Sequence, residues 1–162
     1  MTILRRAALG ALLLAPLALA TPARAADITV EGPWARAAVQ GGTGGVFLTL
    51  RNAGAQPDRL LSAASPVARA AELHETVRDG EVMRMRPVTA IEVPAGGTVT
   101  LRPGSLHLML VRLSQALRQG TTVPVTLNFE RGGSLTVQAE VRAAGAGGGM
   151  PHGDHGHGGH GG

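Results

Sequence analysis

The sequence predicts an all-β fold, an antiparallel sandwich or barrel. Three observations indicate this class. Short runs rich in β-branched and apolar residues recur along the chain, turn signals separate them at regular intervals, and no run of useful length has a convincing helical period. The turn signals are mostly Gly and Pro, of which the 162 residues include 24 and 10. Frequent reversals between short strands explain that abundance.

Ten runs are predicted as strands, each bounded by turn residues. In chain order they cover residues 28–30, 45–51, 59–62, 71–78, 81–86, 91–93, 98–101, 106–113, 123–130 and 134–141. A turn is expected at Gly32-Pro33 after the first run, and the tight turn signal Asp79-Gly80 separates the fourth run from the fifth. Large aromatic side chains dominate core burial, so we expect all three aromatic residues in the core: Trp34, Phe47 and Phe129.

The first 25 residues have the pattern of a secretory signal peptide. Two arginines precede an apolar run at residues 7–20, and a small-x-small cleavage site ends at Ala25. The alternative is a transmembrane anchor, but the run is shorter than the ~20 residues that a span needs. We therefore expect cleavage after Ala25, export to the periplasm and no stable membrane insertion. No Cys follows the run, so a lipid-anchored cysteine is not expected.

The remaining chain divides by composition into a domain and a tail. Residues 26–142 carry the predicted strands and are expected to form one β-barrel domain. Residues 143–162 are rich in Ala and Gly, then in His and Gly, and nothing in them can bury a core. They are predicted to form a disordered tail.

Charge and cysteine content exclude several classes of function. Without the three arginines of the signal peptide, 12 Arg face 11 acidic residues, a net charge of +1, and the arginines are scattered singly. This is not the footprint of a nucleic-acid-binding protein. The chain has no Cys, which excludes a disulfide framework, a thiol oxidoreductase and a blue-copper centre with a thiolate ligand.

His74, Met85, His107 and Met109 are the candidate metal ligands. Outside the tail the chain has no other His, and after the initiator its only other Met is Met83. Thioether sulfur binds soft cations, and the soft first-row ion among the candidates is Cu(I). Two imidazoles and two thioethers form an uncharged set that suits a monovalent soft ion. Such a set does not suit Ca²⁺ or Mg²⁺, which prefer oxygen ligands.

The turn signal predicts how two of these ligands meet. If Asp79-Gly80 is the two-residue loop of a hairpin, His74 lies directly opposite Met85. Opposed side chains share a face, with Cβ atoms ~5 Å apart, so a metal fits between them. A slip of one residue would move the two side chains to opposite faces.

The other two ligands are predicted to share a face of a single strand. His107 and Met109 are two residues apart, which is ~6.6–6.8 Å along a strand, while Leu108 and Leu110 point toward the core. Packing this strand near the hairpin would complete a site of two His and two Met. A lone Met is usually a core residue and a lone His usually structural, but four placements converge on this site.

Two neighbours of the ligands are ambiguous. Met83 would oppose Thr76 on the face of Met85, nearer the turn, and we favour a surface or packing role over a transient thioether ligand. Glu72 shares the face of His74. We favour a solvated strand residue over a hydrogen-bond partner of the imidazole.

These residues resemble the periplasmic copper chaperone family PCuAC. The family's mark, His-x10-Met-x21-His-x-Met, fits His74, Met85, His107 and Met109 without adjustment. The flanking segments 71–75, 82–88, 91–97 and 103–110 are also similar, and the likeness extends over residues 28–141. It implies a cupredoxin-like Greek-key β-barrel that binds Cu(I) near its surface through these four residues.

The resemblance also implies a role. Copper would be delivered to the binuclear copper centre of cytochrome c oxidase, on subunit II, directly or with a thioredoxin-like Sco-type partner. We expect a monomer that is not an enzyme and binds no nucleic acid.

Some members of the family carry a Met/His-rich extension that binds a second copper, often Cu(II), and residues 150–160 look like one. Imidazole also suits Zn and Ni, and we expect weak binding that fades as the His protonate near pH ~6.5. The alternative is a solubilising or added tail. The candidate ligands in it are Met150, His152, His155, His157 and His160.

The sequence is compatible with three functions to different degrees. A copper-transfer protein is favoured, and its site should be shallow and solvent-accessible because it must release its ion. A copper or zinc buffer without a dedicated acceptor fits nearly as well. A metalloenzyme such as a copper oxidase is disfavoured, because no general acid/base pair accompanies the site and the chain has no Tyr for a radical cofactor.

Overall fold

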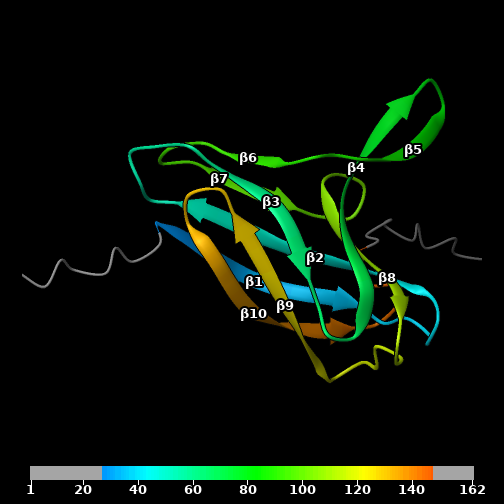
Figure 1. The fold of residues 1–162 in the computed structure, drawn as a ribbon. Coiled ribbons are helices and arrows are strands. Elements are labelled where there is room, and N and C mark those ends of the chain that lie inside the picture. The colour runs from blue at the N-terminus through cyan, green and yellow to red at the C-terminus, as the bar shows by residue number, and fades with distance from the viewer. Residues whose placement is uncertain (1–26, 148–162) are drawn as a thin grey trace, which may run out of the picture.

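The computed structural model describes residues 27–147, which form ten β-strands (Figure 1). Each predicted run overlaps one of them, so the all-β fold class is confirmed. No helix in the described range is long and apolar enough to cross a membrane. The strands are β1 (Ile28–Arg36), β2 (Thr43–Asn52), β3 (Asp58–Ala64), β4 (Ala68–Asp79), β5 (Val82–Pro87), β6 (Ile91–Val93), β7 (Thr98–Leu101), β8 (His107–Leu113), β9 (Thr122–Phe129) and β10 (Gly133–Arg142).

Seven of the strands close into a barrel. Their order is β4-β8-β2-β1-β10-β9-β3, and a pairing between Ala63 of β3 and Ala71 of β4 closes the ring. The other three strands extend it, because β5 pairs with β4, β6 with β3 and β7 with β2. The outer part of β4 and all of β5 project from the barrel as a hairpin (Figure 1).

One pairing in the barrel is parallel, which corrects the prediction of a purely antiparallel fold. β1 and β10 run in the same direction, with Trp34 opposite Glu140 and Arg36 opposite Arg142. A parallel pair cannot be joined by a tight hairpin and needs a long connection. Here the connection is the whole domain between the first and last strands, which the local pattern of turns does not reveal.

β1 is longer than predicted because the Gly32-Pro33 signal marks a bulge and not a turn. The register with β2 shifts between Glu31 and Trp34, and Gly32 has φ +54°. A bulge bends a strand and increases its twist without ending it. β1 therefore continues to Arg36, which reaches the candidate site described below.

The barrel interior is a core of aliphatic side chains. Two of the predicted core aromatics, Phe47 and Phe129, are buried, whereas Trp34 stays partly exposed with its ring centroid 4.4 Å from that of Phe47. The largest fully buried side chains include Leu50, Leu60, Leu101, Leu108, Leu110 and Leu127.

The chain after β10 stays against the barrel for longer than expected. The structure describes a turn at residues 143–147, where the sequence pattern predicts disorder. Arg36 Nη2 donates a hydrogen bond to the Ala146 carbonyl at 3.0 Å, and a Cβ on Gly147 would lie 2.8 Å from Pro103. The described chain therefore contacts the barrel for five residues beyond Arg142, the predicted end of the domain. Residues 1–26, which include the predicted signal peptide, and residues 148–162, with every candidate tail ligand, lie outside the described residues.

Candidate metal centre

Strand β4 is central to the site because it pairs with β8 on one side and with β5 on the other. His74 lies directly opposite His107 of β8, and Glu72 lies opposite Met109. On the other side, Met85 of β5 is paired with Thr76. Because opposed residues and residues two apart share a face, all four candidate ligands lie on one face of the sheet.

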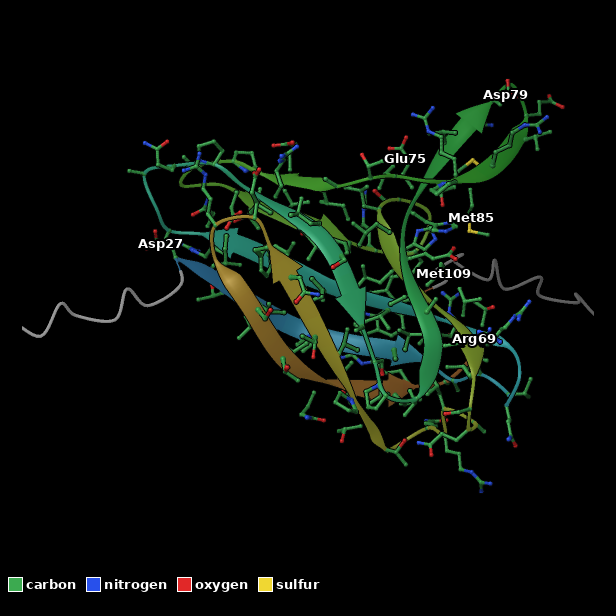
Figure 2. The ribbon with its side chains drawn as sticks, viewed as in Figure 1. Asp27, Arg69, Glu75, Asp79, Met85 and Met109 are labelled. Atoms are coloured by element: carbon green, nitrogen blue, oxygen red, sulfur yellow. The ribbon has the colours of Figure 1, made fainter. Side chains whose placement is uncertain are left out.

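Figure 2 shows Met85 on the projecting hairpin and Met109 below it on the barrel. Both side chains line the same pocket. The structure thus gathers the candidate ligands at the junction of the hairpin and the barrel.

The register of the hairpin differs from the prediction. The two-residue loop is Gly80-Glu81 and not Asp79-Gly80, since Asp79 still pairs with Val82. The pairing is displaced by two residues, so His74 faces Pro87, and Met85 is its diagonal neighbour and not its direct partner. The predicted direct pair was therefore wrong.

Two local features account for the observed turn. Gly80 stands first in the loop with φ +63°, a conformation that glycine adopts without steric cost. The Asp79 carboxylate forms an ion pair with Arg84 Nε at 2.9 Å, which holds Asp79 within the ladder. Because the displacement is an even number of residues, Met85 keeps the face of His74, as side chains alternate with a period of two.

The difference in register also changes the predicted partner of Met83. It lies opposite Arg78, not opposite Thr76 as predicted, and is 56 % exposed. It shares the face of Met85 but lies two pairs nearer the turn. The structure places it on the surface of the hairpin, away from the residues that line the pocket.

His107 is buried, with only 4 % of its surface exposed. Its ring lies 5.9 Å from that of His74 and 6.4 Å from that of Phe47, centroid to centroid. Nδ1 is 2.8 Å from the Ser105 carbonyl oxygen, which only accepts hydrogen bonds, so Nδ1 carries the proton. This leaves the lone pair of Nε2 free to bind a metal.

His74 uses the opposite nitrogen for its hydrogen bond. Its Nε2 lies 2.9 Å from Glu72 Oε2, and its Nδ1 is buried without a hydrogen-bond partner among the described residues. Glu72 is exposed, as the favoured interpretation expects, and its carboxylate also lies within hydrogen-bond distance of the imidazole, as the alternative expects. A buried ring nitrogen without a partner is the kind of group that a bound cation satisfies.

Exposure increases from the barrel toward the hairpin. His107 is buried, Met109 is partly buried, and Met85 is 61 % exposed. The expectation of a shallow, accessible site thus holds for Met85 but not for His107. His107 is covered because β8 lies between β4 and β2, whose Phe47 ring packs toward it.

The pocket beside these residues has a volume of about 230 Å³. Among residues 27–147, Arg36 is the one charged residue that lines it, and no carboxylate does. His74 lies beside the pocket and not in its wall. The lining residues are Arg36, Thr43, Gly45, Phe47, Thr76, Met85, Pro103, Gly104, His107 and Met109.

Several residues that line this pocket were not predicted from the sequence. Gly45 lies opposite Met109, and a Cβ on it would lie 2.9 Å from the Phe47 ring. Glycine is therefore required there to admit the ring. The Arg36 guanidinium carbon lies 5.5 Å from the centre of the same ring. Alternation along β2 could have suggested the contact between Gly45 and Phe47, but no local signal brings Arg36 to this strand.

Soft donors dominate the chemistry of the site. Within residues 27–147 no group of three or more His, Cys, Asp or Glu is arranged to hold a metal ion. The two imidazoles are accompanied instead by the thioethers of Met85 and Met109. The fold and this cluster define a class: a small β-barrel with an imidazole and thioether site at the base of a hairpin.

Comparison with known proteins agrees with this class. The chain belongs to the family described as "Putative lipoprotein LpqE-like", whose model matches residues 28–141. A relative from Leifsonia xyli subsp. xyli, "Putative lipoprotein Lxx21020", is 33 % identical over 129 residues, which are 78 % of this chain and 77 % of the relative. Family membership confirms the resemblance inferred from the sequence and the expectation that the chain is not an enzyme.

Solved structures of PCuAC domains have the same fold. The copper-bound PCuAC domain from PmoF2 matches with a TM-score of 0.63 and 30 % identity, covering 72 % of this chain and 93 % of that domain. The Cu(I) form of DR1885 from Deinococcus radiodurans matches with a TM-score of 0.55 and 34 % identity, covering 70 % of this chain and 78 % of that protein. The expected barrel fold is confirmed.

Proposed function

We propose that this protein is an exported copper chaperone that binds Cu(I) through His74, Met85, His107 and Met109. The observation that carries the proposal is the convergence of these four soft donors on one face of the β5-β4-β8 sheet. Two of the similar solved structures are copper-bound: the PCuAC domain from PmoF2, and DR1885, which holds Cu(I).

The charge of the pocket supports a monovalent ion. In the part of the chain that the structure describes, its lining contains the Arg36 guanidinium and no carboxylate, and the proposed ligands are neutral. A divalent ion feels twice the repulsion from Arg36 that a monovalent ion feels at the same distance. Thioether sulfur adds a second preference for Cu(I), because it is a soft ligand.

The gradient of exposure supports transfer. His107 is buried on the pocket side of β8, where a hydrogen bond to Ser105 and the neighbouring Phe47 ring hold it, while the Met85 thioether is open to solvent. A partner can therefore approach the ion from the side of Met85 before the imidazoles release it. An ion enclosed by buried ligands on every side would exchange slowly.

The proposed acceptor is the binuclear copper centre of cytochrome c oxidase, on subunit II, reached directly or through a Sco-type protein, with the chaperone acting as a monomer in the periplasm. The test is a transfer assay. The Cu(I)-loaded chaperone is mixed anaerobically with the apo soluble domain of subunit II, and the metal content of each is measured after separation. The proposal predicts transfer to the apo domain.

The control in this assay is His107→Ala, which removes the most buried ligand. This variant should take up little Cu(I) and transfer little. Copper that stays on the wild-type chaperone in the presence of both the apo domain and a reduced Sco-type protein would contradict the delivery role.

The alternative, a copper or zinc buffer without a dedicated acceptor, makes a different prediction in the cell. A strain lacking the chaperone should then assemble cytochrome c oxidase normally at limiting copper. The delivery role predicts low oxidase activity that added copper restores.

The tail is proposed to bind a second copper, as Cu(II), through Met150, His152, His155, His157 and His160. Gly147, the last described residue, packs against Trp34 and Pro103, and Pro103 lines the pocket. His152 is five residues further on, within about 17 Å of chain if fully extended. Replacing the four tail histidines by Ala should reduce Cu(II) uptake and leave one Cu(I) bound.

A further inference from the structure

We propose that Glu72 is a positioning residue that fixes the tautomer of His74, so that His74 binds copper through Nδ1 while His107 binds through Nε2. The inference rests on the proposed copper site and adds to it the choice of nitrogen and the residue responsible for that choice.

The proton of the His74 ring lies on the nitrogen that faces Glu72. Nε2 lies 2.9 Å from Glu72 Oε2, and a carboxylate only accepts hydrogen bonds. The proton of the neutral imidazole is therefore on Nε2, and the lone pair is on Nδ1. That nitrogen is buried and has no hydrogen-bond partner within residues 27–147.

His107 is protonated on the other ring nitrogen. There the Ser105 carbonyl accepts the hydrogen bond, at 2.8 Å from Nδ1, which leaves the lone pair on Nε2. The two histidines are direct partners across β4 and β8, with ring centroids 5.9 Å apart. Each ring has one nitrogen held by an acceptor and one nitrogen free.

The position of Glu72 allows it to hold the His74 ring. It lies two residues before His74 on the same face of β4 and directly opposite Met109. Its side chain is half-exposed, so its charge remains in contact with water while one oxygen holds the imidazole. A carboxylate on the far nitrogen fixes the ring orientation of a metal-binding His and increases its basicity.

The test reads the tautomers directly. Long-range ¹H–¹⁵N spectra of the full-length protein, labelled with ¹⁵N-histidine, assign the protonated nitrogen of each ring without metal and after one equivalent of Cu(I). Without metal we expect the proton on Nε2 of His74 and on Nδ1 of His107. After loading, the shifts caused by coordination should appear at Nδ1 of His74 and Nε2 of His107.

Three variants separate positioning from other roles. Glu72→Ala should give a mixture of His74 tautomers and bind Cu(I) about 10–100-fold more weakly. Glu72→Gln keeps an acceptor oxygen and should retain the tautomer and most of the affinity. Glu75→Gln is the matched control on the same strand, because the Glu75 side chain lies on the face of β4 opposite to His74 and accepts a hydrogen bond from Arg86 at 2.6 Å.

The proposal is overturned if the metal-free His74 tautomer is the same in Glu72→Ala as in the wild type, or if Cu(I) shifts Nε2 of His74. It is also overturned if Glu72→Gln loses as much affinity as Glu72→Ala, because that result indicates a direct carboxylate ligand. Failure of the wild type to bind Cu(I) would reject the proposed function. The metal-free spectra test the effect of Glu72 on the His74 tautomer whether or not copper binds.

Discussion

At the scale of the residue, the candidate ligands differ in how firmly the fold holds them. His107 is buried and hydrogen-bonded to Ser105, and His74 is hydrogen-bonded to Glu72. Met85 has no such support and is 61 % exposed. The imidazoles therefore form the fixed part of the site, and the exposed thioether is the part that can exchange.

The two exposed methionines of β5 provide a matched comparison. Met85→Leu should weaken Cu(I) binding by at least about tenfold, or about 1.4 kcal/mol, because it removes a proposed ligand. Met83→Leu should change the affinity little, since Met83 lies two pairs nearer the turn and outside the pocket lining. Competition with a chromophoric Cu(I) chelator measures both. Equal losses in the two variants would show that Met83 also binds.

Arg36 offers a test of charge selectivity. Arg36→Gln should increase the affinity for Zn²⁺ more than the affinity for Cu(I), because the repulsion that it removes is larger for the divalent ion. Arg118→Gln is the control, since Arg118 does not line this pocket. Parallel competition titrations with the two metals give the ratio. An unchanged ratio in Arg36→Gln would mean that the guanidinium does not influence the choice of ion.

At the scale of the element, the β4–β5 hairpin decides where Met85 lies. The sequence pattern correctly predicts both strands and the shared face of His74 and Met85. It does not predict the register, because Asp79-Gly80 and Gly80-Glu81 both place Gly80 in the loop. In the observed register Gly80 comes first in the loop, and Asp79 stays in the ladder, where it pairs with Arg84. Because the register differs from the prediction by two residues, Met85 stays on the face of His74, and the predicted grouping of the ligands is kept.

Gly80 should be the residue that holds this turn in place. Its φ of +63° is costly for any residue with a Cβ, by about 1–2 kcal/mol, so Gly80→Ala should destabilise the hairpin. Amide hydrogen exchange in β5 should become faster by about tenfold. Gly96→Ala, at the same φ of +63° in another turn, is the control and should leave β5 unchanged. Unaltered exchange of β5 in Gly80→Ala would refute this account of the turn.

A second element-scale contact joins β3 to the end of β9. Arg59 donates two hydrogen bonds to Glu130, at 2.9 and 2.6 Å. The hydrogen bond from Arg59 lowers the pKa of Glu130 below its usual value of 4.5. The contribution of this pair to stability is therefore present above that value and is lost as the pH falls through the lower folded pKa.

This linkage predicts how a variant behaves with pH. Glu130→Gln should be less stable than the wild type near pH 7, and the difference should shrink as the pH falls below about 4. Urea unfolding at a series of pH values measures the difference. Glu92→Gln is the comparison, since Glu92 lies farther from Arg59, at 3.9 Å, and should matter less. A Glu130→Gln deficit that is constant from pH 7 to pH 3 would contradict the assignment.

At the scale of the whole molecule, the barrel brings together ligands that are far apart in the sequence. The pairing of β4 with β8 places His74 beside His107, and β1 carries Arg36 to the same pocket. The spacing of rare His and Met residues was enough to predict the four candidate ligands. The pairing of strands distant in the chain, the burial of His107 and the parallel β1–β10 contact depend on barrel closure, which leaves no local signature.

The C-terminal segment is the other feature of this scale. Residues 143–147 pack against β1, so the tail begins beside the candidate metal pocket. The composition of these residues gives no reason to expect order. The order comes from Arg36 and Trp34, which the bulge in β1 allows to reach this end of the barrel.

The central claim is that the barrel binds Cu(I) through two imidazoles and two thioethers. X-ray absorption at the copper edge tests it most directly, on the full-length protein with its four tail histidines replaced by Ala and loaded anaerobically with one equivalent of Cu(I). We predict scattering from both sulfur and imidazole nitrogen, with the sulfur contribution reduced in Met109→Leu. A spectrum with nitrogen or oxygen scattering alone would contradict the claim.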